Sequence, residues 1–283
     1  MIQEEFMKRF KNFMIFIVVF ITGVILLIAH GNSDLQIREF YIKSEKIPES
    51  FNNFRIAQVS DLHNTEFGKE NKKLIEKLKK TDADIIVVTG DIIDSNKTDV
   101  SVALDFSKKA SEIAPTYYVS GNHEAAVSFT ECEKLKKGLI DAGVTILQNS
   151  VTEIKIGEDA ITLMGINDPL FEIERKPMSQ RIEEIVPDND NYKILLAHRP
   201  EYFEEYCRFA DLTFSGHAHG GQFIVPFVGG IVAPGQGFFP KYYDGLYSKE
   251  ESNMIVSRGI GNSIIPFRIN NKPEIIVAEL IKK

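Results

Sequence analysis

The chain has 283 residues, of which 43% are hydrophobic and 26% are charged, and this composition excludes an intrinsically disordered protein. The formal net charge of −7 at pH 7 excludes nucleic-acid binding through a basic face that neutralises phosphates. Two cysteines, Cys132 and Cys207, are too few and too far apart for a zinc knuckle or a disulfide framework. We therefore expect free thiols in preference to a single disulfide.

An apolar run at residues 13–29 follows the positive charges of Lys8, Arg9 and Lys11. The run is just long enough to cross the hydrocarbon layer as a helix, and the preceding charges predict a cytoplasmic N-terminus. We therefore expect a single-pass cell-membrane protein. Residues 1–34 would form the cytoplasmic tail and the anchor, and residues 35–283 would form one extracytoplasmic domain. The alternative is a cleaved signal peptide, because small residues follow the run at suitable spacing.

Apolar runs alternate with helical patterns along the rest of the chain, which predicts an α/β fold. Strands are expected at residues 35–42, 54–60, 85–88, 116–119, 194–197, 212–214, 254–257 and 275–280. Helices are expected at residues 71–80, 100–111, 128–142, 178–186 and 201–209. Three short strands at residues 144–147, 151–156 and 161–164 predict an antiparallel section between the two halves.

Polar runs follow five of these strands, and they hold five of the six histidines of the chain. The runs are Asp61-Leu62-His63, Gly90-Asp91-Ile92-Ile93-Asp94, Gly121-Asn122-His123-Glu124, Ala197-His198 and Gly216-His217-Ala218-His219-Gly220. Loops beyond the carboxyl ends of strands converge in an open α/β sheet, so these side chains are expected to meet.

Carboxylate, imidazole and amide groups gathered at strand ends predict a transition-metal site rather than a calcium site. A carboxylate such as Asp91 can bridge two cations. Two cations about 3.5–4 Å apart can lower the pKa of a bridging water and hold the oxygens of an in-line displacement at phosphorus. Gly90, Gly121 and Gly216 are expected to permit the sharp turns, with positive φ if required, that direct the next residue to the metals.

The five runs, taken in order, resemble the calcineurin-like metallophosphoesterase superfamily, whose pattern is DxH, GDxxD, GNHE or GNHD, a single H, and GHxH. The resemblance covers residues 35–283 and implies a four-layer α/β/β/α sandwich of two mixed sheets, here with an N-terminal transmembrane helix. It implies hydrolysis of a phosphate mono- or diester by attack of a hydroxide that bridges two divalent metal ions. Mn²⁺ is favoured, with Fe²⁺ and Zn²⁺ as alternatives.

The same resemblance implies a role for each residue of the five runs. The first metal would be held by Asp61, His63 and His219, the second by Asn122, His198 and His217, and Asp91 would bridge them. His123 would be the catalytic histidine, which donates a proton to the leaving oxygen or stabilises charge on the phosphoryl group. Asp94 stands where the superfamily has a carboxylate that orients this histidine, and Glu124 fits the same role.

The predicted anchor, the run from Gly216 to Gln222 and the tail from Ser257 to Glu274 resemble the small membrane-associated bacterial branch of the superfamily. Some relatives there cleave pyrophosphate bonds in nucleotide-linked lipids, which keeps a lipid-linked pyrophosphatase with a lipid-like substrate as an alternative. The aromatic residues after Gln222 would line an apolar substrate groove or pack in the core.

Two further interpretations stay open. Arg258 and Arg268 are candidates for recognition of the substrate phosphate, or they are ordinary surface arginines. A non-enzymatic binding scaffold on the same fold is the other alternative function. Such scaffolds usually lose metal ligands, and none is missing from this sequence.

Overall fold

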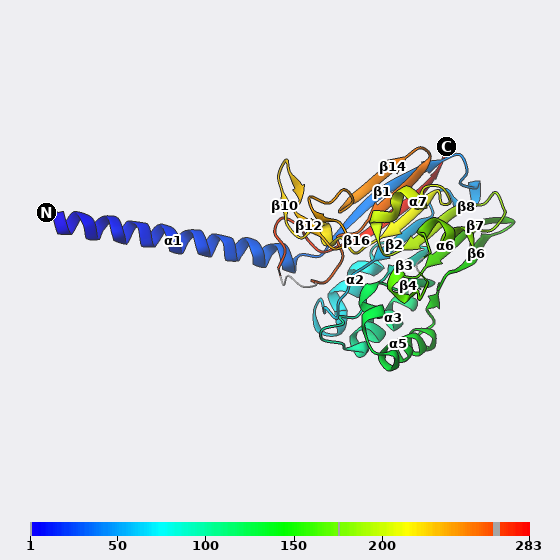
Figure 1. The fold of residues 1–283 in the computed structure, drawn as a ribbon, viewed down its shortest axis with the longest axis horizontal. Helices are drawn as coiled ribbons and strands as arrows, with labels where there is room; N and C mark the ends of the chain where they lie inside the picture. Colours follow the sequence, from blue (N-terminus) through cyan, green and yellow to red (C-terminus); the bar gives the residue numbers. More distant parts are fainter. Residues whose placement is uncertain (1, 175, 263–266) are drawn as a thin grey trace.

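The computed structural model of the chain describes residues 2–174, 176–262 and 267–283, and it describes only the backbone at residues 2, 24, 25 and 27–33. The first element is α1 (Ile2–Ser33), which extends away from the remaining elements in Figure 1. Within the residues that the structure describes, no helix combines the length and the apolar character needed to cross a membrane. The anchor expected at residues 13–29 falls on α1, partly on positions whose side chains lie outside the described residues, and it stays a prediction.

The domain contains two mixed six-stranded sheets. The first has the order β1-β16-β2-β3-β4-β5, and its strands are β1 (Gln36–Ser44), β16 (Glu274–Lys282), β2 (Arg55–Val59), β3 (Ile85–Thr89), β4 (Thr116–Val119) and β5 (Thr145–Ile146). The second has the order β14-β15-β9-β8-β7-β6, and its strands are β14 (Gly245–Lys249), β15 (Ser252–Val256), β9 (Leu212–Ser215), β8 (Tyr192–Ala197), β7 (Asp159–Ile166) and β6 (Ser150–Ile156). The predicted two-sheet α/β fold is therefore confirmed.

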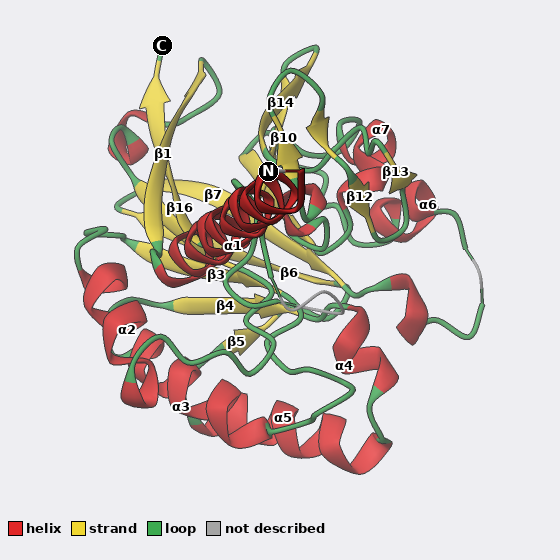
Figure 2. Ribbon diagram, turned by 90° about the vertical axis from the view of Figure 1, so that its left-hand side faces the viewer, coloured by secondary structure: helices red, strands yellow, loops and turns green. Residues whose placement is uncertain are grey.

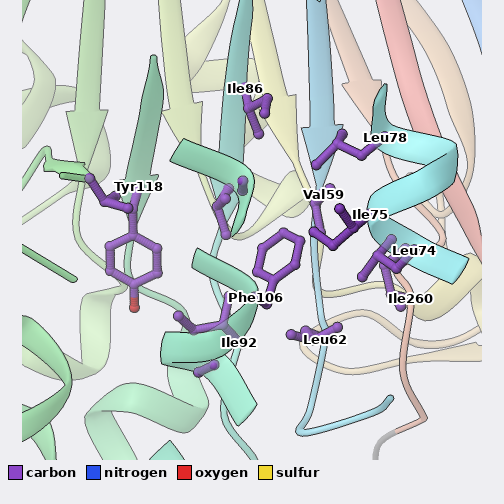
Figure 3. Packing of buried hydrophobic residues seen from close by; sticks show 14 of the residues in the cluster. Val59, Leu62, Leu74, Ile75, Leu78, Ile86, Ile92, Phe106, Tyr118 and Ile260 are labelled. Carbon is purple, nitrogen blue, oxygen red and sulfur yellow. The ribbon is translucent and has the colours of Figure 1, made fainter. Parts of the chain in front are cut away.

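Three apolar cores show that the two sheets pack face to face between two helical layers. The first core joins the first sheet to α2 (Lys72–Lys79), α3 (Val100–Ser111) and α5 (Phe129–Asp141). Figure 3 shows part of it, with Phe106 of α3 beside Val59 of β2 and Leu74 of α2. The second core lies between the sheets, and the third joins the second sheet to α6 (Met178–Glu183) and α7 (Phe203–Tyr206). Figure 2 shows the two helical layers on opposite sides.

Parallel pairing in the centre of each sheet brings the polar runs to one region. β2, β3 and β4 are parallel neighbours in the first sheet, and β8 and β9 are parallel neighbours in the second. Their carboxyl ends carry all five runs, and the run after β4 forms the short helix α4 (Asn122–Ala126). The sheet topology therefore explains why residues far apart in sequence meet.

Two expectations about local structure need correction. The strand near residue 145 is not part of an antiparallel section, because β5 pairs parallel with β4 in the first sheet. The other two strands of that section, β6 and β7, do pair antiparallel, as expected. The helix expected at residues 201–209 is confined to the four residues of α7 after a turn that begins at Pro200. The two cysteines are free, as expected.

Candidate metal centre

The structure brings together all seven residues that the sequence predicted as metal ligands. In the first group, His63 Nε2 lies 3.2 Å from His219 Nε2, and Asp61 Oδ1 lies 3.5 Å from His219 Nε2. In the second group, His198 Nε2 lies 3.2 Å from Asn122 Oδ1 and 3.1 Å from His217 Nδ1. Asn122 is half-buried, and the other six are buried.

Asp91 lies between the two groups. Its Oδ2 is 3.7 Å from His63 Nε2 on one side and 3.2 Å from His198 Nε2 on the other. Ligand atoms of Asp61, His63 and His219 lie within 4.8 Å of one another, and so do those of Asp91, His198 and His217. This is the position required of a carboxylate that binds two cations.

The spacing and orientation of these atoms fit divalent cations. Two nitrogen ligands at bonds of about 2.1 Å and a right angle lie roughly 3 Å apart, close to the separations found here. The ring of His198 is oriented by its Nδ1–H, which donates to the carbonyl oxygen of Thr89 at 2.7 Å and leaves Nε2 directed at the other ligands. The mixture of nitrogen and oxygen donors suits Mn²⁺, Fe²⁺ or Zn²⁺.

Burial keeps three of the imidazoles in the neutral form that binds cations. It lowers the pKa of His63 to about 4 and holds the pKa of His217 and of His219 well below the ordinary value. Burial works to raise the pKa of Asp91, but the charge and the hydrogen bond of His198 outweigh it and hold that pKa well below its usual range. The carboxylate between the two groups is therefore ionised. Burial works to lower the pKa of His198, but the charge and hydrogen bond of Asp91 outweigh it and raise that pKa to about 10, so a cation that binds His198 must displace a proton from it.

Glycines make room for the ligands beside them. Gly90 has a φ of 87°, as a turn with positive φ requires. A Cβ on Gly121 would lie 2.2 Å from Asp91 Oδ1, and a Cβ on Gly216 would lie 2.4 Å from Asp61 Oδ2. Gly121 and Gly216 are thus required for space rather than for positive φ.

Glu124 holds two metal-ligand loops together, and this role differs from the expected one. Its Oε2 accepts hydrogen bonds from the backbone N–H groups of Asp91 at 2.9 Å and Gly121 at 2.7 Å, and its Oε1 accepts from Ile92 N–H at 2.8 Å. These contacts fix the loops after β3 and β4 rather than the ring of His123. Burial raises the pKa of Glu124 to about 7, so the backbone donors stabilise a carboxylate that its surroundings disfavour.

His123 lies against the first group, with its ring centroid 4.4 Å from that of His63. Its Nδ1 accepts a hydrogen bond from Ser95 N–H at 3.0 Å, and the Ser95 hydroxyl lies 3.1 Å away. The carboxylate of Asp94 is farther, with Oδ1 3.6 Å from the same nitrogen. Ser95, which the sequence did not single out, therefore fixes the neutral ring with its proton on Nε2.

The two arginines proposed for phosphate recognition contact groups of the protein itself. Arg258 is half-buried and donates to both carboxylate oxygens of Asp244 at 2.8 Å. Arg268 is not a surface residue, because its side chain is completely buried and donates to the carbonyl oxygen of Arg258 at 2.7 Å and to Asn262 at 3.0 Å. This placement favours a structural role for Arg268.

A different arginine, Arg199, stands at the edge of the metal centre. Its Nη1 lies 3.4 Å from His217 Nε2, and its Nε donates to the buried carboxylate of Asp168 at 2.6 Å. The side chain is partly exposed, so a guanidinium group held in a fixed position borders the second ligand group. The sequence signal for Arg199 was its position directly after His198. A neighbouring position does not predict where an arginine side chain points.

Comparison with known proteins gives a consistent result. The calcineurin-like phosphoesterase family matches residues 54–221. The chain is 30% identical over 258 residues to the uncharacterized metallophosphoesterase YkuE of Bacillus subtilis, covering 87% of this chain and 85% of that protein. It is 32% identical over 201 residues to the phosphodiesterase YaeI of Escherichia coli, covering 70% of each chain.

Two more distant proteins are also similar. A protein of Danio rerio named a transmembrane protein with metallophosphoesterase domain is 28% identical over 247 residues, which are 83% of this chain and 54% of that protein. Among solved structures, the sulfate thiohydrolase SoxB of Thermus thermophilus superposes with a TM-score of 0.52 at 13% identity, covering 83% of this chain and 58% of that one. At this identity the likeness shows the fold alone.

Proposed function

The chain belongs to the calcineurin-like phosphoesterase family and is a metal-dependent phosphoric ester hydrolase, and we propose that it hydrolyses a phosphate mono- or diester at a centre of two divalent cations. The observation that carries the proposal is the pair of ligand groups that meet at Asp91. YaeI, a relative, is named a phosphodiesterase, which supports a phosphodiester as one substrate class.

Each cation would have its own set of residues. Asp61, His63 and His219 would hold the first, Asn122, His198 and His217 would hold the second, and Asp91 would contact both. Two cations bound there would supply the Lewis acidity and the activated water for an in-line displacement at phosphorus. We favour Mn²⁺, with Fe²⁺ and Zn²⁺ as alternatives, because the donor set suits all three.

His123 would stabilise charge on the phosphoryl group. With Nδ1 accepting from the Ser95 N–H, the ring presents an Nε2–H, which can donate a hydrogen bond to an oxygen of that group. The Asp94 carboxylate lies 3.6 Å from Nδ1. Arg199 would attract the substrate phosphate toward the second ligand group, because its charge faces that side.

Asp91→Asn tests this proposal. The exchange keeps the shape of the side chain and removes its charge, so turnover of aryl phosphate mono- and diesters should be almost abolished in the Mn²⁺-loaded full chain. Asp141→Asn is the matched control, because Asp141 is exposed at the end of α5. Bound metal is measured for each variant by plasma mass spectrometry. A wild-type preparation that holds no metal and stays inactive with added Mn²⁺ would contradict the proposal.

The same variant separates an enzyme from a binding scaffold, since a scaffold would keep its partner after Asp91→Asn. A lipid-linked pyrophosphatase is the second candidate, favoured by the exposed aromatic residues that follow the metal ligands in sequence. A substrate panel decides between the two enzymes. Lipid-linked pyrophosphates hydrolysed no faster than soluble aryl esters would exclude the pyrophosphatase.

We further propose that residues 13–29 hold the protein at the cell membrane, with residues 35–283 on the outer face. The basic residues before this run and the name of the Danio rerio relative support this proposal. Protease added to intact cells should digest residues 35–283. Protection of this region in intact cells, with digestion only after lysis, would reverse the proposed topology.

A further inference from the structure

Large apolar side chains are exposed on two small β-hairpins, at the tip of the first and at the C-terminal end of the second. The first hairpin pairs β10 (Ile224–Val225) with β11 (Gly229–Gly230), and the second pairs β12 (Val232–Ala233) with β13 (Gly237–Phe238). Phe227 is fully exposed, and Phe238 retains 76% exposure. Their neighbours Val228 and Phe239 are also exposed. Packing in the core does not describe these four residues, whereas Tyr242 farther along does pack in the core.

The hairpins are fixed on the loop that carries two predicted metal ligands. Ile231 N–H donates to the carbonyl oxygens of Gly221 and Phe223, each at 3.0 Å. A Cβ on Gly221 would lie 2.5 Å from Gly230 Cα, so the two segments approach at a distance that only glycine permits. Only two residues separate His219 from Gln222, whose side chain donates to the carbonyl oxygen of Phe267 at 2.7 Å. The exposed aromatic rings therefore project from a hydrogen-bonded platform.

The hairpins lie on the side of the domain from which α1 leaves. Figure 1 shows β10 and β12 at the end of the domain next to α1, and Figure 2 views the molecule from that side. The chain after α1 is tied to the same region, because Asp34 pairs with Lys272 at 2.6 Å and Gln36 N–H donates to the carbonyl oxygen of Pro273 at 3.0 Å.

An open groove lies between the first hairpin and the start of β1. It has a volume of about 860 Å³, and Ile224, Val225 and Ile269 line it together with Asp244, Arg258 and Lys272. On α1 itself, the exposed fraction is 53% for Phe10, 66% for Phe16 and 63% for Phe20, among other exposed apolar residues. Exposed apolar side chains therefore lie on α1, beside the groove and on both hairpins, on one side of the domain.

From this arrangement we infer that the exposed side chains of the two hairpins insert into the surface of a lipid bilayer, beside the point where α1 meets it. Residues 13–21 of α1 are apolar without interruption, and a bilayer is the medium that would cover both this stretch and the rings beside the helix. Aromatic side chains are favoured at the boundary between lipid and water. The inference rests on the proposed function, and it places the metal-ligand loop next to lipid head groups. It thus assigns the enzyme a phosphate ester carried at a lipid surface.

The absence of tryptophan from the chain allows a direct test. Phe227→Trp and Phe238→Trp each introduce a single fluorescent reporter into the full chain. Phe129→Trp is the matched control, because Phe129 is 81% exposed on α5, away from the hairpins in Figure 1. Each variant is reconstituted in phosphatidylcholine and phosphatidylglycerol vesicles with plain or brominated acyl chains, and thermal unfolding verifies that each has folded.

Brominated lipid should quench both hairpin reporters about twofold or more, and it should leave the control unchanged, because quenching requires contact with the acyl chains. Equal emission from the hairpin reporters in both lipids would overturn the inference, as would equal quenching of all three. Emission that shifts to the blue with protein concentration, without quenching, would show that the two hairpins contact a second copy of the chain. That result would also overturn the inference.

The proposed function is measured separately, as turnover of a soluble aryl phosphate diester by the wild-type full chain. If that chain is active and the reporters are not quenched, only the lipid contact is abandoned. If the reporters are quenched and the metal-loaded chain is inactive, the proposed function fails while the membrane contact stands.

Discussion

Replacing Gly121 by alanine should abolish metal binding and lower the free energy of unfolding. The new Cβ would lie 2.2 Å from Asp91 Oδ1 and 2.6 Å from the Asp91 backbone nitrogen. The φ of Gly121 is −105°, so alanine fits the backbone and the effect is steric. Relief requires Asp91 to move, which breaks the 2.8 Å hydrogen bond from His123 N–H to its Oδ1. Overpacking and the lost hydrogen bond together should lower the free energy of unfolding by about 2–5 kcal/mol.

The assay combines urea unfolding of the metal-free protein with metal content by plasma mass spectrometry. Gly138→Ala is the control, because its Cβ would lie 2.4 Å from Leu104 Cδ1, a comparable clash between α5 and α3 away from the metal centre. Leu104 can rotate, and alanine favours the helix by about 1 kcal/mol, so this variant should lose less stability and keep its metals. Two bound metals and normal turnover in Gly121→Ala would refute the placement of Asp91 between the two cations.

Three other predictions follow from the same contacts. Glu124→Gln places an amide NH2 group against backbone N–H donors, so the free energy of unfolding should fall by about 2–4 kcal/mol. An unchanged urea midpoint would contradict the role of Glu124 between the loops. Arg199→Lys keeps the charge but loses the paired hydrogen bonds to Asp168, so the free energy of unfolding measured in urea should fall by about 1–3 kcal/mol. The control Arg208→Lys, at an exposed position, should leave it almost unchanged. Chelation of bound metal should lower the melting temperature in scanning calorimetry. Each occupied site stabilises the folded state by about 2.7 kcal/mol at a free cation concentration 100 times its Kd. An unchanged melting temperature would argue against cation binding.

The succession of strands along the chain and the location of the site could be predicted from the sequence because both depend on local patterns. The apolar run at residues 85–88 is buried on both sides of a sheet, as its composition indicates, and β3 covers it. The polar run that follows must then lie at the carboxyl end of that strand. The same reasoning placed Asp91 and His198 close together, although they come from different sheets.

Contacts that depend on the final packing could not be predicted in this way. Glu124 is one residue from His123 in sequence, yet its carboxylate reaches the loop after β3 and not the neighbouring ring. Arg268 is buried and donates to the carbonyl oxygen of Arg258, a contact that no local pattern indicates. The strands of the hairpins have two residues each, too few to show the alternation that predicts a strand.

The backbone of the metal loops indicates that the site is formed by the fold before any cation binds. Asp61, His63, Asp91, His217 and His219 all have positive φ, between 46° and 66°. Non-glycine residues rarely adopt this conformation, which costs of the order of 1 kcal/mol or more each, so the surrounding structure must enforce it. Asp61 N–H donates to the carbonyl oxygen of Gly90, and His63 N–H donates to that of Asp91, each at 3.0 Å, while the Asp61 carboxylate accepts from His217 N–H at 3.1 Å. The first two bonds join loops of the first sheet, and the third joins them to the loop after β9 in the second sheet, so the ligands are held in place by the packing of the sheets and need little rearrangement to receive metal.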